Sequence, residues 1–414
     1  MAIISVNYYA GFMEEIYRKL DQVSYEKIVW FGECDRLSLV YDYLAADGYL
    51  ISDVLDNDKA KWGKAVRRNW CMPFAFGYTK IPKKEADLIV AGKKLPKLTI
   101  TSPEEFLRRN GTIARVLFLT SSCRADEIKA QLLDMGADPD YILILPGERA
   151  VWEEACRYID VKSGEKTALT QEKRKHILIR LLEEFRRFCN EKNLRYYLAY
   201  GTLIGAVRHK GLIPWDDDID ILMPVEDYLR FLREYPGRGN YEVLDVSVDD
   251  NYFFPFAKLT DHETFLHHHG MPITWMQGMY IDIFPMSGFE KDRSFEEQWL
   301  SQTLLDIEWY WYYVSRDVIR KKLPDPRKRI LEEKFRIGFD KADKVGVLTT
   351  LPARPWMLDR SVFGSGCELT FEGRTYKAPA CWDRYLKRVY GDYMQIPPED
   401  EQRIHGFPAY MRNM

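Results

Sequence analysis

The run DDDIDILM at 216–223 constrains this chain most, because it places four aspartates at the start of an apolar segment. Successive side chains of a β-strand point to opposite faces, so Asp218 and Asp220 share one face and the intervening isoleucine lies on the other. Two carboxylates about 6–7 Å apart on one face repel each other unless a cation compensates them. The pattern therefore predicts a strand that carries an acidic, cation-binding site; a solvated acidic turn is the alternative.

A second apolar segment, MYIDIF at 279–284, contains the single carboxylate Asp282. An aspartate in a buried strand is costly unless it is paired or bound to a metal, so we expect Asp282 to join the acidic site. Upstream, the sequence predicts a strand at 196–199, a tight turn at Gly201-Thr202 and a short helix at 203–207. The N-terminal amides of such a helix favour an anion, so this turn is predicted to contact a phosphate.

A Gly-Thr turn, an Asp-x-Asp strand and a distant lone aspartate are the arrangement of the nucleotidyltransferase fold, in which two metals assist an in-line phosphoryl displacement. The segment RYYLAYGTLIGAVRHKGLIPWDDDIDILM at 195–223 also resembles the signature of the LicD family, which is related to the fukutins. The resemblance covers about residues 170–405. It continues through FPFAKLTDHETF at 254–265, MYIDIFPMSGF at 279–289 and YLKRVYGDYMQIPPEDEQRIH at 385–405.

The resemblance implies a phosphotransferase with an α+β nucleotidyltransferase-type catalytic domain and a helical C-terminal extension. Family members move a phosphocholine or phospho-alditol unit from a CDP-activated donor to a sugar hydroxyl of a cell-surface glycan. The expected partners are therefore a CDP-linked donor and a glycan or lipid-linked glycan acceptor. Mg²⁺ is the expected cofactor, because it binds carboxylate oxygens together with substrate phosphates, and Mn²⁺ is the alternative.

The site residues that the resemblance and our inference provide fall into two groups. The metal-binding and catalytic carboxylates are Asp218, Asp220 and Asp282. The phosphate contacts are Gly201, Thr202, Arg208 and Lys258, of which the last two are inferred without a family motif. Asp282 is also a candidate general base, because it lies on a separate strand from the other two carboxylates.

Two other functions remain open at this point. A true nucleotidyltransferase would attack an α-phosphate with the same carboxylates and release pyrophosphate, so only the products separate it from a phosphotransferase. A non-catalytic scaffold for glycan assembly is the second alternative, although the intact carboxylates argue against it. The sequence leaves the oligomeric state undetermined.

Upstream of the acidic region, apolar strands alternate with helices. Strands are predicted at 27–31, 49–55, 87–91, 115–120 and 141–145, and helices at 35–46, 103–109 and 124–135. This alternation is typical of a parallel, doubly wound α/β sheet, and it resembles the small Rossmann-like domains that precede some sugar-modifying transferases. We expect a Rossmann-like domain at 1–146, a linker at 147–169 and the catalytic domain at 170–414.

The expected Rossmann-like domain lacks a dinucleotide fingerprint. That fingerprint needs three glycines, and counting from Gly32 the other two positions hold Cys34 and Leu37, whose side chains would crowd a pyrophosphate. Asp56 lies near the position of a ribose-binding acid. We therefore do not expect NAD or NADP to bind. A nucleotide or sugar-nucleotide pocket remains one interpretation, and a scaffold or dimerisation domain the other.

Charge and cysteine usage narrow the class of protein. The 60 basic residues against 63 acidic ones give a net charge of −3, which argues against a dedicated nucleic-acid binder. The seven cysteines include no CxxC pair, which fits a reducing compartment. We see no secretory signal and no apolar run of membrane-spanning length, so we expect a soluble, cytoplasmic protein, free or at the inner face of the plasma membrane.

Two further segments allow more than one interpretation. Histidines at 262 and 267–269 are predicted to lie on a polar strand or hairpin, because consecutive side chains alternate faces and no cysteine is near to complete a zinc site. The aromatic run WYWYY at 309–313 precedes a basic segment, 316–336. Together they form either a peripheral membrane contact or, as we favour, an aromatic core stripe followed by a solvated charged loop.

Overall fold

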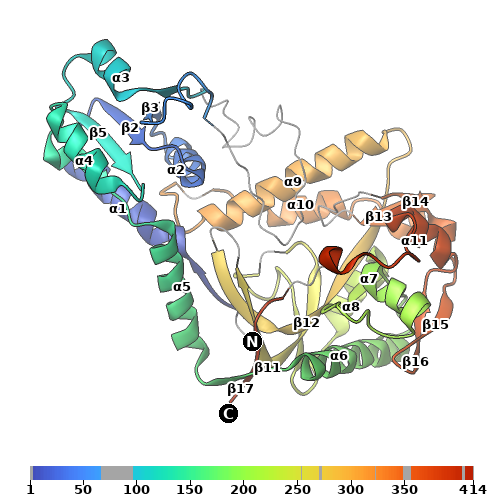
Figure 1. The fold of residues 1–414 in the computed structure, drawn as a ribbon. Coiled ribbons are helices and arrows are strands. Elements are labelled where there is room, and N and C mark those ends of the chain that lie inside the picture. The colour runs from blue at the N-terminus through green and yellow to red at the C-terminus, as the bar shows by residue number, and fades with distance from the viewer. Residues whose placement is uncertain are drawn as a thin grey trace.

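The computed structural model describes residues 3–66, 97–252, 254–269, 273–321, 323–347, 356–402 and 406–413. Within these ranges the strands form a five-stranded sheet, a ten-stranded sheet and a two-stranded hairpin. The two larger sheets lie in separate lobes, which helices α1 (Tyr8–Gln22) and α5 (Glu148–Ser163) join along one side (Figure 1). We call these the N-terminal lobe and the C-terminal lobe.

The N-terminal lobe is built on a sheet with the order β4-β3-β2-β5-β6, in which every neighbouring pair is parallel. Its strands are β2 (Lys27–Phe31), β3 (Ile51–Leu55), β4 (Ile100–Thr101), β5 (Val116–Thr120) and β6 (Ile142–Ile144). Its connecting helices are α2 (Asp35–Ala46), α3 (Pro103–Asn110) and α4 (Ala125–Asp134). The predicted parallel α/β sheet is confirmed, and the narrower Rossmann-like assignment stays a prediction. The strand predicted at 87–91 lies outside the described residues.

The C-terminal lobe is organised around two long antiparallel strands, β11 (Ala257–His269) and β12 (Ile273–Gly288). Strand β9 (Asp220–Pro224) runs parallel to β12, so the sheet is mixed. The other strands are β1 (Ile4–Asn7), β7 (Lys166–Ala168), β8 (Tyr197–Leu198), β10 (Tyr241–Leu244), β13 (Lys344–Val347), β14 (Leu358–Asp359) and β17 (Ala409–Arg412). A mixed sheet with attached helices agrees with the α+β expectation; the nucleotidyltransferase-type assignment stays a prediction.

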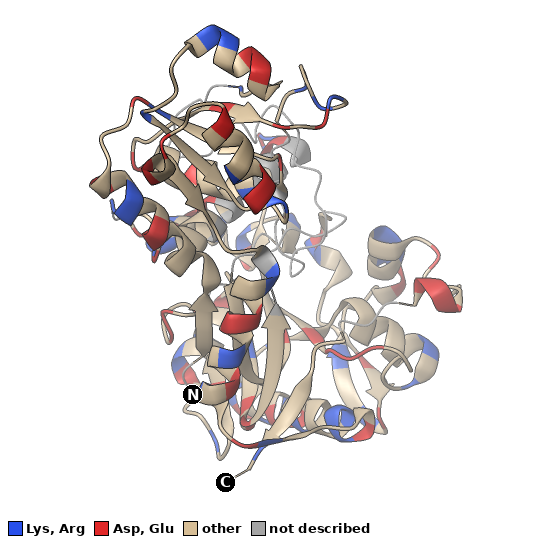
Figure 2. Ribbon diagram, turned by 60° about the vertical axis from the view of Figure 1, so that its left-hand side comes forward, with Lys and Arg blue, Asp and Glu red and all other residues tan. Residues whose placement is uncertain are grey.

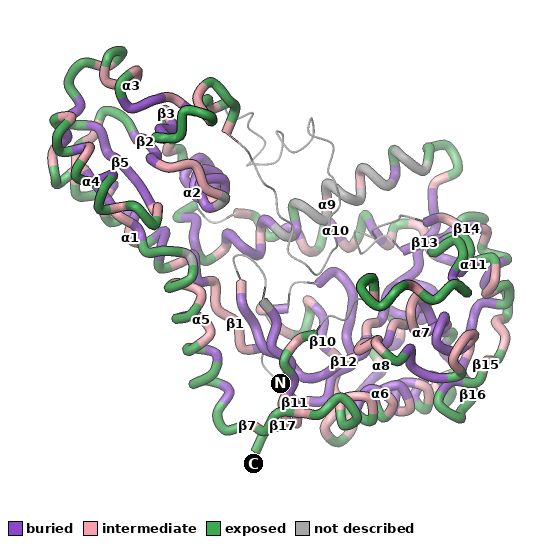
Figure 3. Tube along the Cα trace, in the orientation of Figure 1, coloured by how far each residue is buried: buried purple, intermediate pink, exposed green. Residues whose placement is uncertain are grey.

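Helices pack against this sheet through apolar residues that recur at helical spacing. Helix α6 (Gln171–Lys192) buries Ile177, Leu178, Leu181, Leu182, Phe185 and Phe188. Helices α7 (Tyr200–Ile204), α8 (Val225–Glu234) and α11 (Trp382–Tyr390) also contribute to this core, and the hairpin of β15 (Cys367–Phe371) and β16 (Arg374–Ala378) lies beside it. Figure 3 shows the sheet strands largely buried and the outer helices exposed along one side.

Two segments depart from the predicted division of the chain. Strand β1 belongs to the ten-stranded sheet, where it pairs with β12 from Ile4 opposite Met276 to Asn7 opposite Ile273. The segment 147–169, for which we expected a linker and predicted no helix or strand, contains helix α5 and strand β7. Most of α5 is exposed, and Ala155 and Ile159 are its buried apolar residues, so the sequence carried little periodic signal for a helix.

Trp309, Trp311 and Tyr313 of the aromatic run are buried on helix α9 (Phe295–Ser315), which confirms the core interpretation. Trp309 and Tyr313 belong to the core of the C-terminal lobe. Trp311 belongs to the core of the N-terminal lobe, where its ring stacks on Tyr43 at 5.2 Å between centroids. Helix α9 therefore packs against both lobes: Trp309 and Tyr313 contact the C-terminal lobe, and Trp311 contacts the N-terminal lobe.

The basic segment 316–336 is extensively ion-paired. Its arginines pair with acidic partners in the bridges Arg320–Asp21, Arg327–Asp250, Arg329–Glu308 and Arg336–Glu290. Basic and acidic residues are interspersed over both lobes rather than separated by sign (Figure 2). Among the described helices, none combines the length and apolarity needed to cross a membrane.

Candidate active site

One row of charged side chains crosses three adjacent strands of the ten-stranded sheet. Lys258 on β11 lies opposite Asp282 on β12, and Asp282 lies opposite Asp220 on β9. Opposite residues on neighbouring strands project to the same face, so this row brings two of the predicted carboxylates and the predicted lysine together. Asp218 lies two residues before the start of β9. The amide of Asp282 donates to the carbonyl of Ile219 at 2.8 Å, so the hydrogen bonding between β12 and the β9 segment begins at the residue next to Asp218.

The backbone of Asp220 is held from two directions. Its amide donates to the Thr202 hydroxyl at 2.9 Å, and its carbonyl accepts from the amide of Ala199 at 3.1 Å. Thr202 is buried, so its oxygen faces the protein and not open solvent. The residues Gly201 and Thr202 lie in the first turn of helix α7, which corrects the predicted tight turn. Thr202 thus positions the aspartate strand; a direct phosphate contact stays a prediction.

Gly201 provides space for a carboxylate that we did not predict in the site. A Cβ atom on Gly201 would lie only 2.6 Å from Asp216 Oδ2, so a side chain there would displace Asp216. The first turn of a helix attracts negative charge, which agrees with the position of Asp216. The signal in the sequence was the first aspartate of the run, and only the fold shows that it approaches helix α7.

Electrostatic crowding distinguishes Asp220. Burial raises its pKa well above the ordinary value, and the negative charges of Asp218, Asp282 and Asp216 raise it further. Lys258 opposes this shift but does not outweigh it. Asp220 is therefore a carboxylate whose ionised form needs additional positive charge.

Lys258 is enclosed by the site. Its residue is 1% exposed, and its ammonium lies 3.4 Å from the ring centroid of Tyr280 and 4.6 Å from that of Phe254. It donates a hydrogen bond to Asp282 Oδ1. Burial lowers the pKa of Lys258, while the attraction of Asp282 acts in the opposite direction. Lys258 therefore contacts Asp282, which is a candidate catalytic residue. The predicted contact of Lys258 with a phosphate stays a prediction.

Arg208 contacts the C-terminal part of the chain. Its Nη1 donates to the carbonyl of Tyr393 at 2.7 Å and to that of Gln395 at 3.3 Å. Arg208 lies in the π-helical turn η4 (Gly205–His209), which continues helix α7. The guanidinium therefore fastens residues 393–395 next to the site. The sequence could not show this contact, because the partners are backbone atoms about 185 positions away.

Two further residues near the carboxylates escaped the sequence analysis. Tyr200, the first residue of α7, has φ of 42°, an uncommon backbone conformation for a bulky residue, and its hydroxyl accepts from Trp356 Nε1 at 3.2 Å. Glu372, in the turn between β15 and β16, accepts from the amide of Leu212 at 2.8 Å. Glu372 thereby supports the loop that leads to the aspartates. Tyr200 lies within the segment that resembles the LicD signature, but only the fold shows its contact with Trp356; Glu372 belongs to no motif that we identified.

The carboxylates suit a hard divalent cation, although they do not form a complete ligand set. Within the described part of the chain, no three acidic, histidine or cysteine side chains are grouped closely enough to hold a metal alone. The oxygen ligands and the uncompensated charge at Asp220 nevertheless favour a cation. Mg²⁺ commonly binds through one or two carboxylates and completes its shell with water and substrate phosphates, so the residues fit a metal that arrives with its substrate.

Other candidates from the sequence have structural partners. Asp56 accepts hydrogen bonds from the amides of Glu33 and Asp58 and from Lys61, so its oxygens are committed to the fold. His268 is buried on strand β11 and stacks on Trp275 at 4.9 Å between ring centroids, which confirms the strand interpretation of the histidine run.

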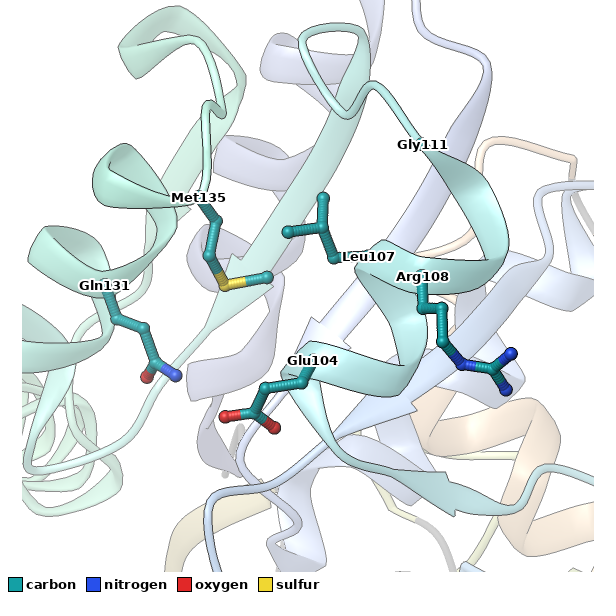
Figure 4. Close-up of a pocket in the computed structure, with 6 residues that line it drawn as sticks. All are labelled: Glu104, Leu107, Arg108, Gly111, Gln131 and Met135. Carbon is teal, nitrogen blue, oxygen red and sulfur yellow. The ribbon is translucent and has the colours of Figure 1, made fainter.

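A groove of about 570 Å³ lies in the N-terminal lobe, between α3 and α4 (Figure 4). Its lining residues are Glu104, Leu107, Arg108, Gly111, Gln131 and Met135. None of the predicted site residues lines it, so we assign the chemistry to the carboxylate row in the other lobe.

Comparisons with known proteins match the part of the chain that contains the carboxylate row. Residues 193–321 match the family described as LicD/FKTN/FKRP, nucleotidyltransferase domain, and this range contains every predicted site residue. The chain is 26% identical over 263 residues to the lipopolysaccharide cholinephosphotransferase LicD of Haemophilus influenzae, covering 57% of this chain and 96% of that protein. It is 36% identical over 119 residues to an uncharacterized protein of Rickettsia typhi, covering 28% and 38% of the two chains. It is 33% identical over 91 residues to one of Rickettsia prowazekii, covering 22% and 33%. The chain therefore carries a domain of the LicD family.

Proposed function

We propose that this chain is a metal-dependent phosphotransferase that moves a phosphocholine or phospho-alditol unit from a CDP-activated donor to a sugar hydroxyl of a cell-surface glycan. The observation that carries the proposal is the row Lys258–Asp282–Asp220, with Asp218 beside it, inside the range that matches the LicD family. The name of the Haemophilus relative supports a phosphotransferase that acts on a glycan.

In this proposal Asp218 and Asp220 hold Mg²⁺, with Asp282 as the third carboxylate and Mn²⁺ as an alternative ion. When bound, the metal neutralises the diphosphate of the donor and makes its phosphorus easier to attack. Thr202 keeps Asp220 in place through the hydrogen bond to its amide. Lys258 keeps Asp282 oriented through its own hydrogen bond. We expect Asp282 to accept the proton of the acceptor hydroxyl, with CMP as the leaving group.

The products of the reaction test this function. With CDP-choline or a CDP-alditol, a glycan acceptor and Mg²⁺, we expect CMP and a new phosphodiester to form in equal amounts. Chelation of the metal should stop both. Pyrophosphate release from CTP, together with transfer of the CMP group to the acceptor, would instead identify a nucleotidyltransferase. Metal-dependent donor binding without turnover would support the scaffold alternative.

A control variant outside the site distinguishes the loss of a site carboxylate from the general effect of removing a negative charge from the lobe. Asp359 lies on β14 of the same sheet, and its carboxylate pairs with Lys344 and Arg384 at the surface. Asp359→Asn removes one carboxylate from the lobe without touching the row, so transfer should continue at the wild-type rate. We also propose a cytoplasmic location, which the thinly spread cysteines support.

A further inference from the structure

Three exposed apolar side chains lie within seven residues at and just after the end of helix α11. Tyr390 is 40% exposed, and Met394 and Ile396 are each 54% exposed. We call residues 390–396 the rim segment. Single exposed apolar residues are normal on protein surfaces, but several together often mark a site of contact.

The rim segment is fastened to the protein and therefore presents these side chains in defined positions. The carbonyls of Tyr393 and Gln395 accept hydrogen bonds from Arg208. The Tyr393 ring is buried, and its hydroxyl donates to Asp383 Oδ1 at 2.7 Å. A surface that is ordered before its ligand arrives loses less conformational entropy on binding.

Contacts through helix α7 place the rim segment beside the carboxylate row. Arg208 lies on the continuation of α7, and the Tyr385 hydroxyl of α11 accepts from the amide of Tyr200 at 3.5 Å. The same helix holds Asp216 over Gly201 and Asp220 through Thr202. Burial raises the pKa of Tyr390, and the charge of Asp220 raises it further, which agrees with this placement.

The chemistry of the rim segment favours a neutral sugar over an anionic lipid surface. The carbon-bound hydrogens of a sugar ring pack against an aromatic face while the hydroxyls stay in water, so a half-exposed tyrosine suits a sugar. Asp392 lies within the segment, and Glu399, Asp400 and Glu401 follow it as exposed acids. These charges would repel the anionic headgroups that attract basic surfaces.

We propose that the rim segment is the acceptor platform: a sugar ring of the acceptor stacks on Tyr390, and Met394 and Ile396 extend the apolar contact. Arg208 is a positioning residue that holds the platform next to the carboxylates. The proposal rests on the proposed function, because it assigns the acceptor side of the same site.

Binding of simple sugars to the full chain tests the platform directly. We expect methyl glucoside, methyl galactoside or methyl N-acetylglucosaminide to bind weakly, as detected by saturation-transfer NMR. Tyr390→Ala should weaken this binding by about 3–10-fold, which is the contribution expected of one aromatic contact. Tyr390→Phe should preserve it, because the ring face and not the hydroxyl makes the contact. The matched control is Tyr158→Ala on α5, which removes a tyrosine that is 47% exposed far along the chain and should change nothing.

Substitutions of Arg208 test its positioning role through their effect on sugar binding. Arg208→Ala should weaken sugar binding, and Arg208→Lys should restore most of it, because a lysine can still donate to the carbonyls of residues 393 and 395. In transfer assays, Tyr390→Ala should raise the KM for the acceptor while the kcat and the affinity for CDP-choline, measured by calorimetry, stay unchanged.

The platform and the proposed function fail in different ways. If the wild type binds neither CDP-choline nor a CDP-alditol in the presence of Mg²⁺, the proposed function is wrong, while loss of sugar binding in Tyr390→Ala would still support the platform. Equal sugar binding by the wild type and Tyr390→Ala, or no binding of any of the three glycosides, would overturn the platform. Binding of phosphatidylglycerol vesicles that depends on Tyr390, without sugar binding, would reassign the rim segment to a membrane.

Discussion

Each lobe has an aspartate at the end of a strand, and the two carboxylates have opposite electrostatic environments. Asp56 follows β3 in the N-terminal lobe, and Asp220 begins β9 in the C-terminal lobe. Burial alone would raise the pKa of Asp56, but hydrogen bonds from Lys61 and from the amides of Asp58 and Glu33 lower it. Burial raises the pKa of Asp220, and the neighbouring carboxylates add to that shift.

The difference shows how a structural acid can be distinguished from a functional one. The oxygens of Asp56 are satisfied by partners within five residues of it or on the adjacent turn, so its negative charge stabilises the loop after β3. Asp220 has like charges around it, and the nearby cation Lys258 is bonded to Asp282. A strand-end acid whose charge the fold does not balance is the better candidate for chemistry.

The largest expected effect is the loss of catalysis on replacing Asp220. Asp220→Asn keeps the size of the side chain but removes its charge, so transfer should fall by more than about a hundredfold. Asp56→Asn should leave the rate per folded molecule unchanged. Both can be measured as CMP release under saturating donor. A near wild-type rate for Asp220→Asn would remove the distinction between the two acids.

The next largest effect concerns the connection between the lobes. Trp311→Ala removes a buried ring from the contact with Tyr43, so the free energy of unfolding should fall by about 3–5 kcal/mol. Trp311→Phe should recover part of it, because a smaller ring can still stack. Urea titrations followed by circular dichroism would measure both. A second, separate transition in Trp311→Ala would show that the lobes no longer unfold together, whereas an unchanged midpoint would contradict the packing role.

A smaller loss of stability is expected from Asp56→Asn. The substitution removes the charge that Lys61 and two amides contact, so the free energy of unfolding should fall by about 1–3 kcal/mol. The neighbouring Asp58→Asn is the control, because Asp58 is exposed and its carboxylate accepts one amide bond, from Ala60. If both variants lose equally little, Asp56 is not a structural acid.

The smallest effects are opposite pH dependences of stability. The folded-state pKa of Asp56 is lowered, so its stabilisation is present above the unfolded value of about 3.9 and is lost as the pH falls through the folded pKa. The folded-state pKa of Asp220 is raised, so without metal its carboxyl opposes folding increasingly as the pH rises above about 3.9.

Unfolding of metal-free protein at several pH values would check these slopes. The deficit of Asp56→Asn against the wild type should shrink as the pH falls below 4, and Asp220→Asn should be more stable than the wild type at pH 7 but not at pH 3. Mg²⁺ should reduce the advantage of Asp220→Asn. The same slope for both variants would mean that the two environments do not differ.

Local patterns predicted the elements whose residues pack against near neighbours. The apolar strand at 27–31 and the helix at 35–46 appear at those positions, because each carries its own periodic signal. The alternation around Asp218 and Asp220 likewise indicated a strand, and β9 begins at Asp220.

The remaining features depend on pairings that a sequence pattern does not contain. The pattern gave Lys258 and Asp282 separately, but their register across β11 and β12 is set by the whole hairpin. Asp216 was one of three adjacent aspartates, and its approach to Gly201 depends on how the chain folds back after η4, through residues 210–215. The sequence did not indicate helix α5, because this helix buries few apolar residues. Ala155 packs in the core of the N-terminal lobe, and Ile159 packs in a separate small cluster.

Strand β1 has a consequence for the order in which the protein is assembled during translation. Ile4 pairs with Met276, about 270 positions later, so at about 5–20 residues per second the first strand waits roughly 15–55 s for its partner to be synthesised. During that time β1 is an unpaired strand edge, which is prone to wrong pairing. A fragment that begins at residue 170 would have the reverse problem, because the start of β12 would keep an open edge where β1 belongs. Protein engineering that treats the first residues as dispensable would therefore expose the sheet that carries Asp282.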